Sequence, residues 1–189
     1  YHILLDTYRE EEHGGTQIGT TKKGIGPCYE DKIARVGIRM IDLLNPEILR
    51  DKIEKNLKIK NSLFEKYYDK PTLDVEEIYN EYLEIGKQLQ DRIVDTELEL
   101  NEAIRDGKNV LFEGAQALML DIDFGTYPYV TSSSPSTGGV CTGAGVPPTS
   151  LQNLIGVAKA YCTRVGNGPF PSELDNELGE SIRQIGGEF

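Results

Sequence analysis

The sequence has no apolar run long enough to cross a membrane and no secretory signal. A membrane-spanning helix needs roughly 20 consecutive apolar residues, and no segment approaches that length. Charged side chains appear from Asp6 onward, so the apolar core of a signal peptide is missing as well. The chain opens without methionine on residues 1–5, a stretch typical of the inside of an element. We therefore expect a cytoplasmic protein whose sequence begins within a longer chain.

Cysteine and histidine are both scarce. The cysteines number 3, an odd count without close pairing, which argues against a disulfide framework and favours a reducing compartment. The 2 histidines, His2 and His13, do not combine with cysteine in any spacing that suits a metal. A structural zinc site is therefore excluded. The cysteines are Cys28, Cys141 and Cys162.

Basic residues are also in the minority. Lysine and arginine total 20 against 31 acidic residues, so the net charge is −11 and duplex nucleic acid is a poor partner. The exception is the stretch 22–39, in which basic residues outnumber acidic ones. Such a local basic surface suits a small anion better than a polymer, but on charge alone we favour a solvated stretch of mixed charge. Its basic residues are Lys22, Lys23, Lys32, Arg35 and Arg39.

The middle of the chain carries apolar residues at helical spacing. Asn45 followed by Pro46 favours a helix start, because Asn caps well and Pro is tolerated in the first turn. Asp74 with Glu77 three residues later resembles a capping box, and Gly107 is a natural stop. We predict an antiparallel pair of helices over most of 46–69 and 74–105.

The pattern changes at Lys108. Residues 109–112 form a short apolar run before a small-residue turn, and residues 154–164 contain an alternating segment. We predict strands there and an α/β fold: a helical subdomain followed by part of a mainly parallel sheet covered by helices. The predicted units are a helical subdomain with a phosphate loop over 1–107 and part of a central α/β nucleotide-binding domain over 108–189.

One glycine-rich loop, Ile18–Pro27, has the composition of a phosphate-binding loop. Glycines let backbone N–H groups approach an anion, and threonine and lysine add donors. The loop is not a Walker A motif, because Ile25 and Gly26 stand where lysine and serine or threonine are required. A plain turn of the same composition remains the alternative.

Other polar residues have both a chemical and an ordinary reading. Lys32 and Arg35 lie three apart on an expected helix and form either an anion-binding face or an exposed helix surface. Gln116 follows the first expected strand, where an amide stabilises an oxyanion or merely shapes a turn. Asp121 and Asp123 could bind a metal, but alternate acids before a glycine more often shape a turn, so we predict no metal ligands. The hydroxyls of 131–134 suit phosphate or a polar loop.

Four segments resemble one family in the same order. Gly24–Arg35 resembles the G-I-G-P-x-Y-x-x-K-x-x-R signature of adenylosuccinate synthetases. Further matches to this family are Phe112–Gln116, Leu120–Ser133 and Thr163–Pro171. The resemblance runs essentially end to end, although 45–105 is weakly diagnostic.

The resemblance implies a ligase of AMP biosynthesis that joins IMP to L-aspartate, consumes GTP with Mg²⁺ and passes through 6-phosphoryl-IMP. It implies that Thr21 and Thr131 contact the IMP 5′-phosphate and that Val165 lies along the ribose. Gln116 matches a supporting catalytic glutamine near the purine 6-oxygen, where an amide stabilises charge during phosphoryl transfer. It also implies a homodimer, in which Arg35 reaches the IMP of the neighbouring subunit. Lys32 receives no role.

Parts of the family pattern are missing from this sequence. The N-terminal GDEGKGK loop with its catalytic aspartate is absent, as is the catalytic histidine that follows. The sequence stops at Gly187–Phe189, before the substrate loop and the guanine-binding segment. We therefore expect an internal fragment that carries much of the IMP site, few of the Mg²⁺ ligands and no activity by itself. A non-enzymatic nucleotide-binding or helical interaction module is the alternative.

Overall fold

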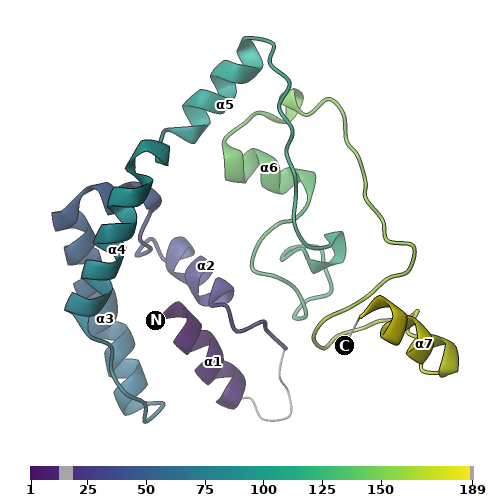
Figure 1. Ribbon diagram of the computed structural model, residues 1–189, viewed down its shortest axis with the longest axis horizontal. Helices are drawn as coiled ribbons and strands as arrows, with labels where there is room; N and C mark the ends of the chain where they lie inside the picture. The colour runs from purple at the N-terminus through teal and green to yellow at the C-terminus, as the bar shows by residue number, and fades with distance from the viewer. Residues whose placement is uncertain (13–18, 188–189) are drawn as a thin grey trace.

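The computed structural model describes residues 1–12 and 19–187, and its regular elements are all helical (Figure 1). The chain forms an open arrangement in which a helical group is connected through α5 to a longer, mostly irregular part (Figure 1). The elements are α1 (His2–Glu12), α2 (Ile25–Ile33), η1 (Met40–Leu44), α3 (Pro46–Lys66), α4 (Val75–Leu89), η2 (Gln90–Arg92), α5 (Thr96–Arg105), η3 (Leu118–Leu120), α6 (Thr137–Ala144), η4 (Pro148–Ser150) and α7 (Glu177–Gly186).

The helices α3 and α4 run antiparallel, as predicted (Figure 1). Asn45 caps α3 as expected, since its side chain accepts hydrogen bonds from Glu47 N and Ile48 N, both at 3.2 Å. Apolar residues four apart on α3 then meet Leu43 of η1 in a core that α4 partly covers. The fully or almost fully buried members from α3 are Leu49, Ile53 and Leu57.

The second predicted helix, 74–105, is interrupted. Asp74 begins α4 by accepting a hydrogen bond from Glu77 N at 2.8 Å, but α4 ends at Leu89. Asp95 then starts α5, because its carboxylate accepts a hydrogen bond from Leu98 N at 3.0 Å. The end near Gly107 is confirmed by its left-handed φ of 73°.

The helix α1 packs across both α2 and α3. Leu5 of α1 and Phe64 of α3 are both 0% exposed, and the Tyr8 ring meets the Phe64 ring edge-on at 5.4 Å. At the start of α2, Gly24 has φ 75°, and a Cβ there would lie 2.6 Å from Ile3 N. Only glycine therefore allows α1 and α2 to approach this closely.

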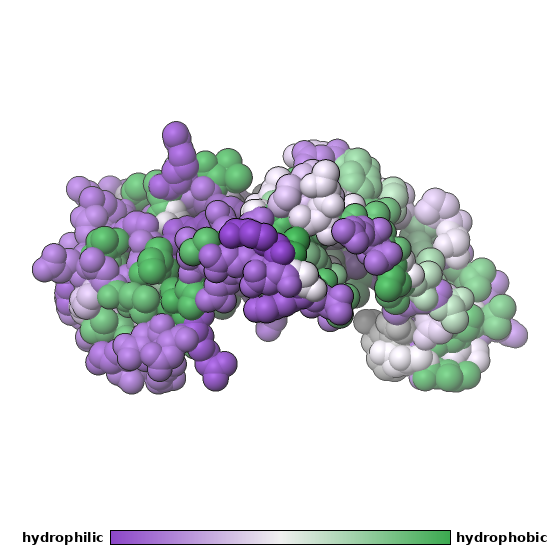
Figure 2. All heavy atoms as spheres, turned by 90° about the horizontal axis from the view of Figure 1, so that it is seen from above, coloured by the Kyte–Doolittle hydropathy of each residue, from purple (hydrophilic) through white to green (hydrophobic). Residues whose placement is uncertain are grey.

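The predicted parallel sheet is wrong, because no strand occurs among residues 1–12 and 19–187. Residues 109–112 and 154–164 contain no β-bridge, and their apolar side chains face outward: Leu111 is 84% exposed and Val157 is 96% exposed. A β-strand forms only when it is hydrogen-bonded to a neighbouring strand. An alternating sequence predicts which way the side chains face but does not provide that neighbouring strand. Figure 2 shows hydrophobic side chains reaching the surface at both ends of the molecule.

Two helices follow that the sequence analysis did not predict. α6 forms within a serine- and glycine-rich stretch and ends at Gly145, which has a φ of 66°. α7 begins at Asn176, whose side chain accepts a hydrogen bond from Gly179 N at 3.0 Å. α7 leaves large apolar side chains exposed, since Leu178 is 61% and Ile185 is 85% exposed.

Membrane insertion and cysteine pairing find no support in the residues that the structure describes. None of their helices has the length and apolar character needed to cross a bilayer. Cys28, Cys141 and Cys162 are all free thiols.

Candidate functional site

The glycine-rich loop before α2 is anchored by two carboxylates of α1. Asp6 is 7% exposed and accepts hydrogen bonds from Thr20 Oγ1 at 3.1 Å and from Gly24 N at 2.9 Å. Glu10 accepts one from Thr20 N at 3.4 Å. These backbone and hydroxyl donors already donate to carboxylates, so an anion bound at this loop has to be held by other hydrogen-bond donors. Thr21 is exposed beside them, whereas Ile18 lies outside the described residues.

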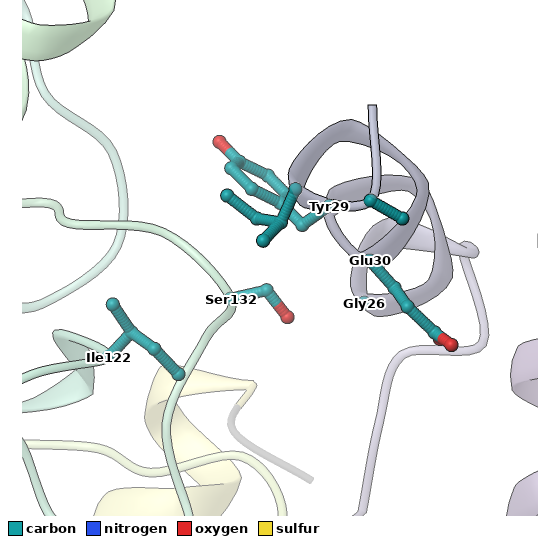
Figure 3. Close-up of a pocket in the computed structure, with 7 residues that line it drawn as sticks. Gly26, Tyr29, Glu30, Ile122 and Ser132 are labelled. Carbon is teal, nitrogen blue, oxygen red and sulfur yellow. The ribbon is translucent and has the colours of Figure 1, made fainter. Parts of the chain in front are cut away.

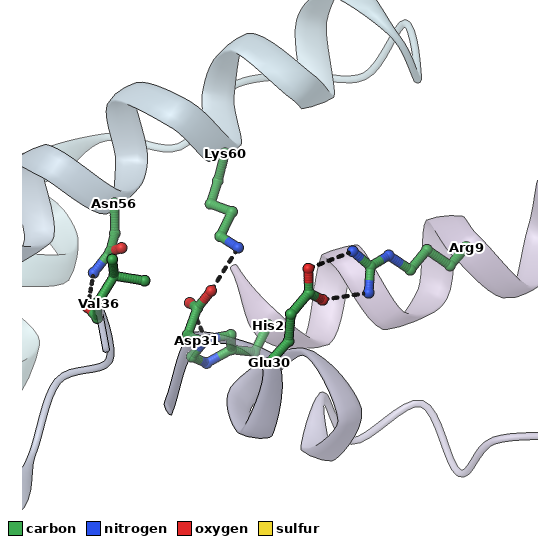
Figure 4. A network of polar contacts seen from close by, with 7 residues as sticks. All are labelled: His2, Arg9, Glu30, Asp31, Val36, Asn56 and Lys60. Atoms are coloured by element: carbon green, nitrogen blue, oxygen red, sulfur yellow. Dashed lines mark hydrogen bonds and ion pairs between the residues drawn. The ribbon is translucent and has the colours of Figure 1, made fainter. Parts of the chain in front are cut away.

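A buried ion pair fixes α2 against its neighbours (Figure 4). Asp31 is 3% exposed and accepts hydrogen bonds from Lys60 Nζ of α3 and His2 Nε2 of α1, both at 2.8 Å. Burial raises the pKa of Asp31, but these two bonds outweigh it and the net shift is downward. Burial lowers the pKa of His2, so its neutral ring donates from Nε2. The pair is therefore an ionised Asp31 with a charged Lys60.

Arg35 lies two residues beyond α2, so its predicted place on a helix is corrected. The chain leaves α2 through a Schellman motif, in which Arg35 N donates to Lys32 O at 3.1 Å and Val36 N donates to Asp31 O at 3.0 Å. Arg35 takes the left-handed position usually given to glycine, with φ 64°. This conformation costs a non-glycine residue about 1 kcal/mol, and the exposed Arg35 side chain is kept there despite that cost. Lys32 lies over the Tyr29 ring, with Nζ 5.5 Å from the ring centre.

Gln116 and Thr131 are brought together although they are far apart in the sequence. Gln116 Nε2 donates to Thr131 Oγ1 at 3.1 Å. Gln116 also has a left-handed backbone, with φ 66°, which is uncommon for a residue other than glycine. Since the Thr131 hydroxyl accepts this bond, its own proton remains for a further acceptor.

Asp121 shapes a turn, as the sequence analysis favoured. It is 1% exposed, accepts a hydrogen bond from Asp123 N at 2.9 Å and another from the Ser134 hydroxyl. The bond from Ser134 is the main reason that the pKa of Asp121 is lowered. No group of three or more potential metal ligands occurs within residues 1–12 and 19–187. The carboxylate therefore organises the turn of this loop.

An open groove separates α2 from this loop (Figure 3). It has a volume of about 540 Å³, and a Cβ on Gly26 would lie 3.5 Å from Ser132 Oγ. Tyr29 projects from α2 toward the groove, and Ile122 and Ser132 line the opposite side (Figure 3). The groove is thus bounded by two of the segments that carry the sequence signature.

The segment around Val165 reaches the same region. A Cβ on Gly19 would lie 2.8 Å from Gly166 Cα, so the two backbones touch where glycines stand on both sides. Arg164 ties this segment to the preceding loop, because Nη2 donates to Tyr129 O at 3.1 Å. Val165 itself is 80% exposed.

The predicted residues therefore fall into two places. The loop of Thr21 adjoins the segment of Val165, and Gln116 lies with Thr131 in the loop opposite α2. Arg35 is at the far end of α2, which at 1.5 Å per residue lies roughly 15 Å from Gly24. The two residues before Arg35, Ile33 and Ala34, line the groove together with Ser132, which follows Thr131.

The sequence analysis missed the residues that support these candidates. A signal existed for one pair, because Asp6 and Glu10 are four residues apart on α1 and face the same side. Asp31 and Lys60 are separated by 29 residues and left no local signal. Arg164 belongs to a signature segment but was given no part.

Comparisons with known proteins agree with the signature. The adenylosuccinate synthetase family model matches residues 1–189. An adenylosuccinate synthetase of Bacillus licheniformis is 56% identical over 189 residues, which are 100% of this chain and 44% of that protein. The one from Oceanobacillus iheyensis has the same identity and coverage. A solved structure described as fully ligated adenylosuccinate synthetase from Plasmodium falciparum superposes with a TM-score of 0.92, at 44% identity, over 100% of this chain and 44% of that one. The chain thus spans less than half the length of these relatives.

Proposed function

The chain belongs to the adenylosuccinate synthetase family, and from this premise we propose that it supplies much of the IMP site of a ligase that joins IMP to L-aspartate. The complete enzyme transfers the γ-phosphoryl group of GTP to the 6-oxygen of IMP. The aspartate amine then displaces phosphate, which leaves adenylosuccinate, GDP and phosphate. Since the chain spans 44% of the length of its relatives, we assign the activity to the complete enzyme. We place that enzyme in the cytoplasm.

The meeting of signature segments carries this proposal. The hydrogen bond between Gln116 and Thr131, the approach of Gly26 to Ser132 and the contact of Gly19 with Gly166 gather residues from four stretches of the chain around one open region. Ordinary surface turns of similar composition have no reason to converge. We propose further that 1–107 is one structural unit and 108–189 a second.

In this proposal the hydroxyls of Thr21 and Thr131 bind the 5′-phosphate, and Val165 borders the ribose. Two observations support the hydroxyl roles. Thr21 is exposed, so its hydroxyl is accessible to a ligand, whereas a neighbouring donor, Gly24 N, already donates to Asp6. The Thr131 hydroxyl, once the bond from Gln116 opens, has its proton for a phosphate oxygen.

Gln116 supports the chemistry at the other end of the nucleotide. An amide N–H that faces the 6-oxygen stabilises the charge that develops during phosphoryl transfer. Because the 6-oxygen and the 5′-phosphate lie at opposite ends of IMP, the bond from Gln116 to Thr131 has to open when the nucleotide binds. Gln116 is exposed and its strained backbone favours such a change.

Arg35 serves the site of a second subunit in a homodimer. Its Cα lies roughly 15 Å along α2 from Gly24, and we propose that Arg35 and Thr21 hold different phosphates. Its surroundings suit a partner surface, since large apolar side chains nearby are exposed: Ile33 76%, Val36 44%, Met40 55% and Ile41 61%. An arginine fork binds phosphate oxygens in a bidentate way, which a lysine does not.

The family implies Mg²⁺, which the described residues do not fit. They contain no cluster of three ligands, and the carboxylate of Asp121 is occupied by the turn that it organises. We therefore route no step through a metal held by this chain and propose that its ligands lie elsewhere in the complete enzyme.

Calorimetric titration of the chain with IMP and GTP tests the assignment of the nucleotide. We expect weak binding of IMP, because a partial site is poorly preorganised, no binding of GTP, and no GTP hydrolysis when IMP, aspartate and Mg²⁺ are all present. Thr21→Val should weaken the binding of IMP, whereas Thr72→Val, also exposed, should not. GTP turnover by the chain alone would contradict the proposal.

Complementation in full-length enzyme tests the placement of Arg35. Arg35→Leu should mainly weaken IMP binding, and Gln116→Met should mainly slow the chemical step. In a mixed dimer one of the two sites receives both intact residues, so random exchange should restore about a quarter of the sites. If subunits exchange and activity stays at the level of the separate variants, Arg35 does not act on the neighbour.

A non-catalytic nucleotide-binding module is the second candidate. The exposed apolar residues around Arg35 would then serve an unrelated partner. Assays of the full-length protein separate these two candidates. A non-catalytic module would bind IMP but would form no adenylosuccinate.

A further inference from the structure

One face of α3 grips the turn that carries Arg35. Lys52, Asn56 and Lys60 follow at intervals of four residues and so form one row along the helix. Lys60 binds the carboxylate of Asp31, and Lys52 Nζ lies 3.5 Å from Gly37 O. Between them, Asn56 Nδ2 donates to the carbonyl of Val36 at 3.0 Å (Figure 4). We call these three residues the α3 polar row.

Asn56 is the member of the α3 polar row that contacts the residue directly after Arg35. It is 4% exposed, so its amide is held by the surrounding core. Its bond fixes the peptide unit that follows Val36, the residue whose N–H closes the Schellman motif. Because Arg35 has the disfavoured φ of 64°, its turn depends on such bonds from outside.

We propose that Asn56 is a positioning residue for Arg35: its buried amide holds the Val36 carbonyl and thereby the left-handed turn from which the Arg35 side chain projects. The inference rests on the proposed function, in which Arg35 binds a nucleotide phosphate. A guanidinium that grips phosphate with two N–H groups loses that geometry after a small backbone shift. The chemistry at the 6-oxygen, at the other end of the nucleotide, is unaffected. Loss of the Asn56 donor should therefore raise the KM for IMP and leave kcat in place.

Asn61 offers a matched control on the same helix. Its Nδ2 donates to Leu73 O at 2.8 Å, and its Oδ1 accepts from Leu73 N at 2.9 Å. Asn61 thus pins the loop that leads to α4, away from the turn of Arg35. Asn61→Leu removes at least as many hydrogen bonds as Asn56→Leu without touching that turn.

The test compares four variants of the full-length enzyme: Asn56→Leu, Asn61→Leu, Arg35→Leu and the double variant Asn56→Leu with Arg35→Leu. Asn56→Leu should raise the KM for IMP roughly tenfold at nearly unchanged kcat, and Asn61→Leu should leave the KM unchanged. In the double variant the KM should equal that of Arg35→Leu alone, because Asn56 acts through Arg35. Asn56→Ser, whose shorter side chain cannot reach Val36, should act in the same direction and replaces Asn56→Leu if that variant does not fold.

Three outcomes would overturn the inference. They are a KM that stays constant in Asn56→Leu, a KM that rises equally in Asn61→Leu, and an effect of Asn56→Leu that adds in full to that of Arg35→Leu. Each means that Asn56 supports the fold in general. If instead Arg35→Leu leaves the KM for IMP unchanged, the phosphate-binding role of Arg35 is wrong and the inference falls with it.

Discussion

Residues 1–105 and residues 106–187 obtain their shape from different sources. The first region buries Leu5, Leu49, Leu57 and Phe64 completely, at 0% exposure each, and sets a charged pair among them. In the second region, Val146 is the one buried large apolar side chain that the structure describes. Its loops are organised instead by polar bonds, such as those to Asp121.

The difference indicates where each region can tolerate change. Burial of apolar surface stabilises the first region at about 25 cal/mol per Å², so its geometry depends on the packing of side chains. The second region depends on capped turns and presents its apolar residues outward. We therefore expect its candidate residues, Gln116 and Thr131, to be held less rigidly than α2, in keeping with the opening of their hydrogen bond that we propose for IMP binding.

The largest expected effect comes from truncating leucine in each region. Leu57→Ala should lower the free energy of unfolding by about 3 kcal/mol, because it leaves a cavity where a side chain is 0% exposed. Leu111→Ala, at a residue 84% exposed, should cost less than about 0.5 kcal/mol. Urea denaturation of both variants measures the contrast. Equal losses would mean that the second region has a core of its own.

The buried charge should rank next. Asp31→Ala leaves Lys60 buried without its partner, so we expect a loss of roughly 3 kcal/mol. The matched control is Asp51→Ala, which removes the exposed ion pair that Asp51 makes with Lys55, four residues further along α3. Exposed pairs of this kind contribute about 0.3–0.5 kcal/mol. Thermal unfolding compares the two, and similar shifts in Tm would show that the Asp31 pair contributes no more than a surface pair.

The pH dependence should follow the same carboxylate. The pKa of Asp31 is lowered in the folded chain relative to its ordinary value of 3.8. The ionised form therefore stabilises the fold fully above pH 3.8, and this contribution is lost as the pH falls through the lower folded-state pKa. Denaturation at several pH values should show a steeper loss in the native chain than in Asp31→Asn. Parallel curves would assign acid unfolding to other groups.

The smallest effect concerns the backbone of Arg35. Arg35→Gly should raise the free energy of unfolding by about 0.5 kcal/mol, because glycine adopts φ 64° without strain. Lys32→Gly, inside α2, should lower it by about 1 kcal/mol. Both are measured by urea denaturation, and opposite signs are the expected result. A loss of stability in Arg35→Gly would show that the arginine side chain stabilises its own turn.

Helix starts were predictable because their signals are local. Asn45 and Asp74 cap the helices that they were expected to begin. The break before α5 was missed because the apolar stripe continues through it, although Asp95 followed by acidic residues was a visible cap signal. The sheet could not be judged from sequence, since alternation in 154–164 describes the side chains and not the strand partner.

The candidate site was predictable only as a set of segments. Their order in the chain pointed to the family, but the pairing of Gln116 with Thr131 depends on a loop that Asp121 folds back on itself. The carboxylates beneath the glycine-rich loop are also products of tertiary packing. Such contacts leave no periodic pattern for sequence reasoning to find.

Asp31 also constrains the order in which the chain folds. It lies 29 residues from His2 and 29 residues from Lys60, so completing its contacts closes a loop on each side, and loop closure costs entropy before any contact rewards it. Helices such as α3 form from local contacts, which are fast. We therefore expect α3 to form before α2 docks. The turn of Arg35 is closed by a hydrogen bond to the carbonyl of Asp31, so we expect it to be among the last parts of this region to become native.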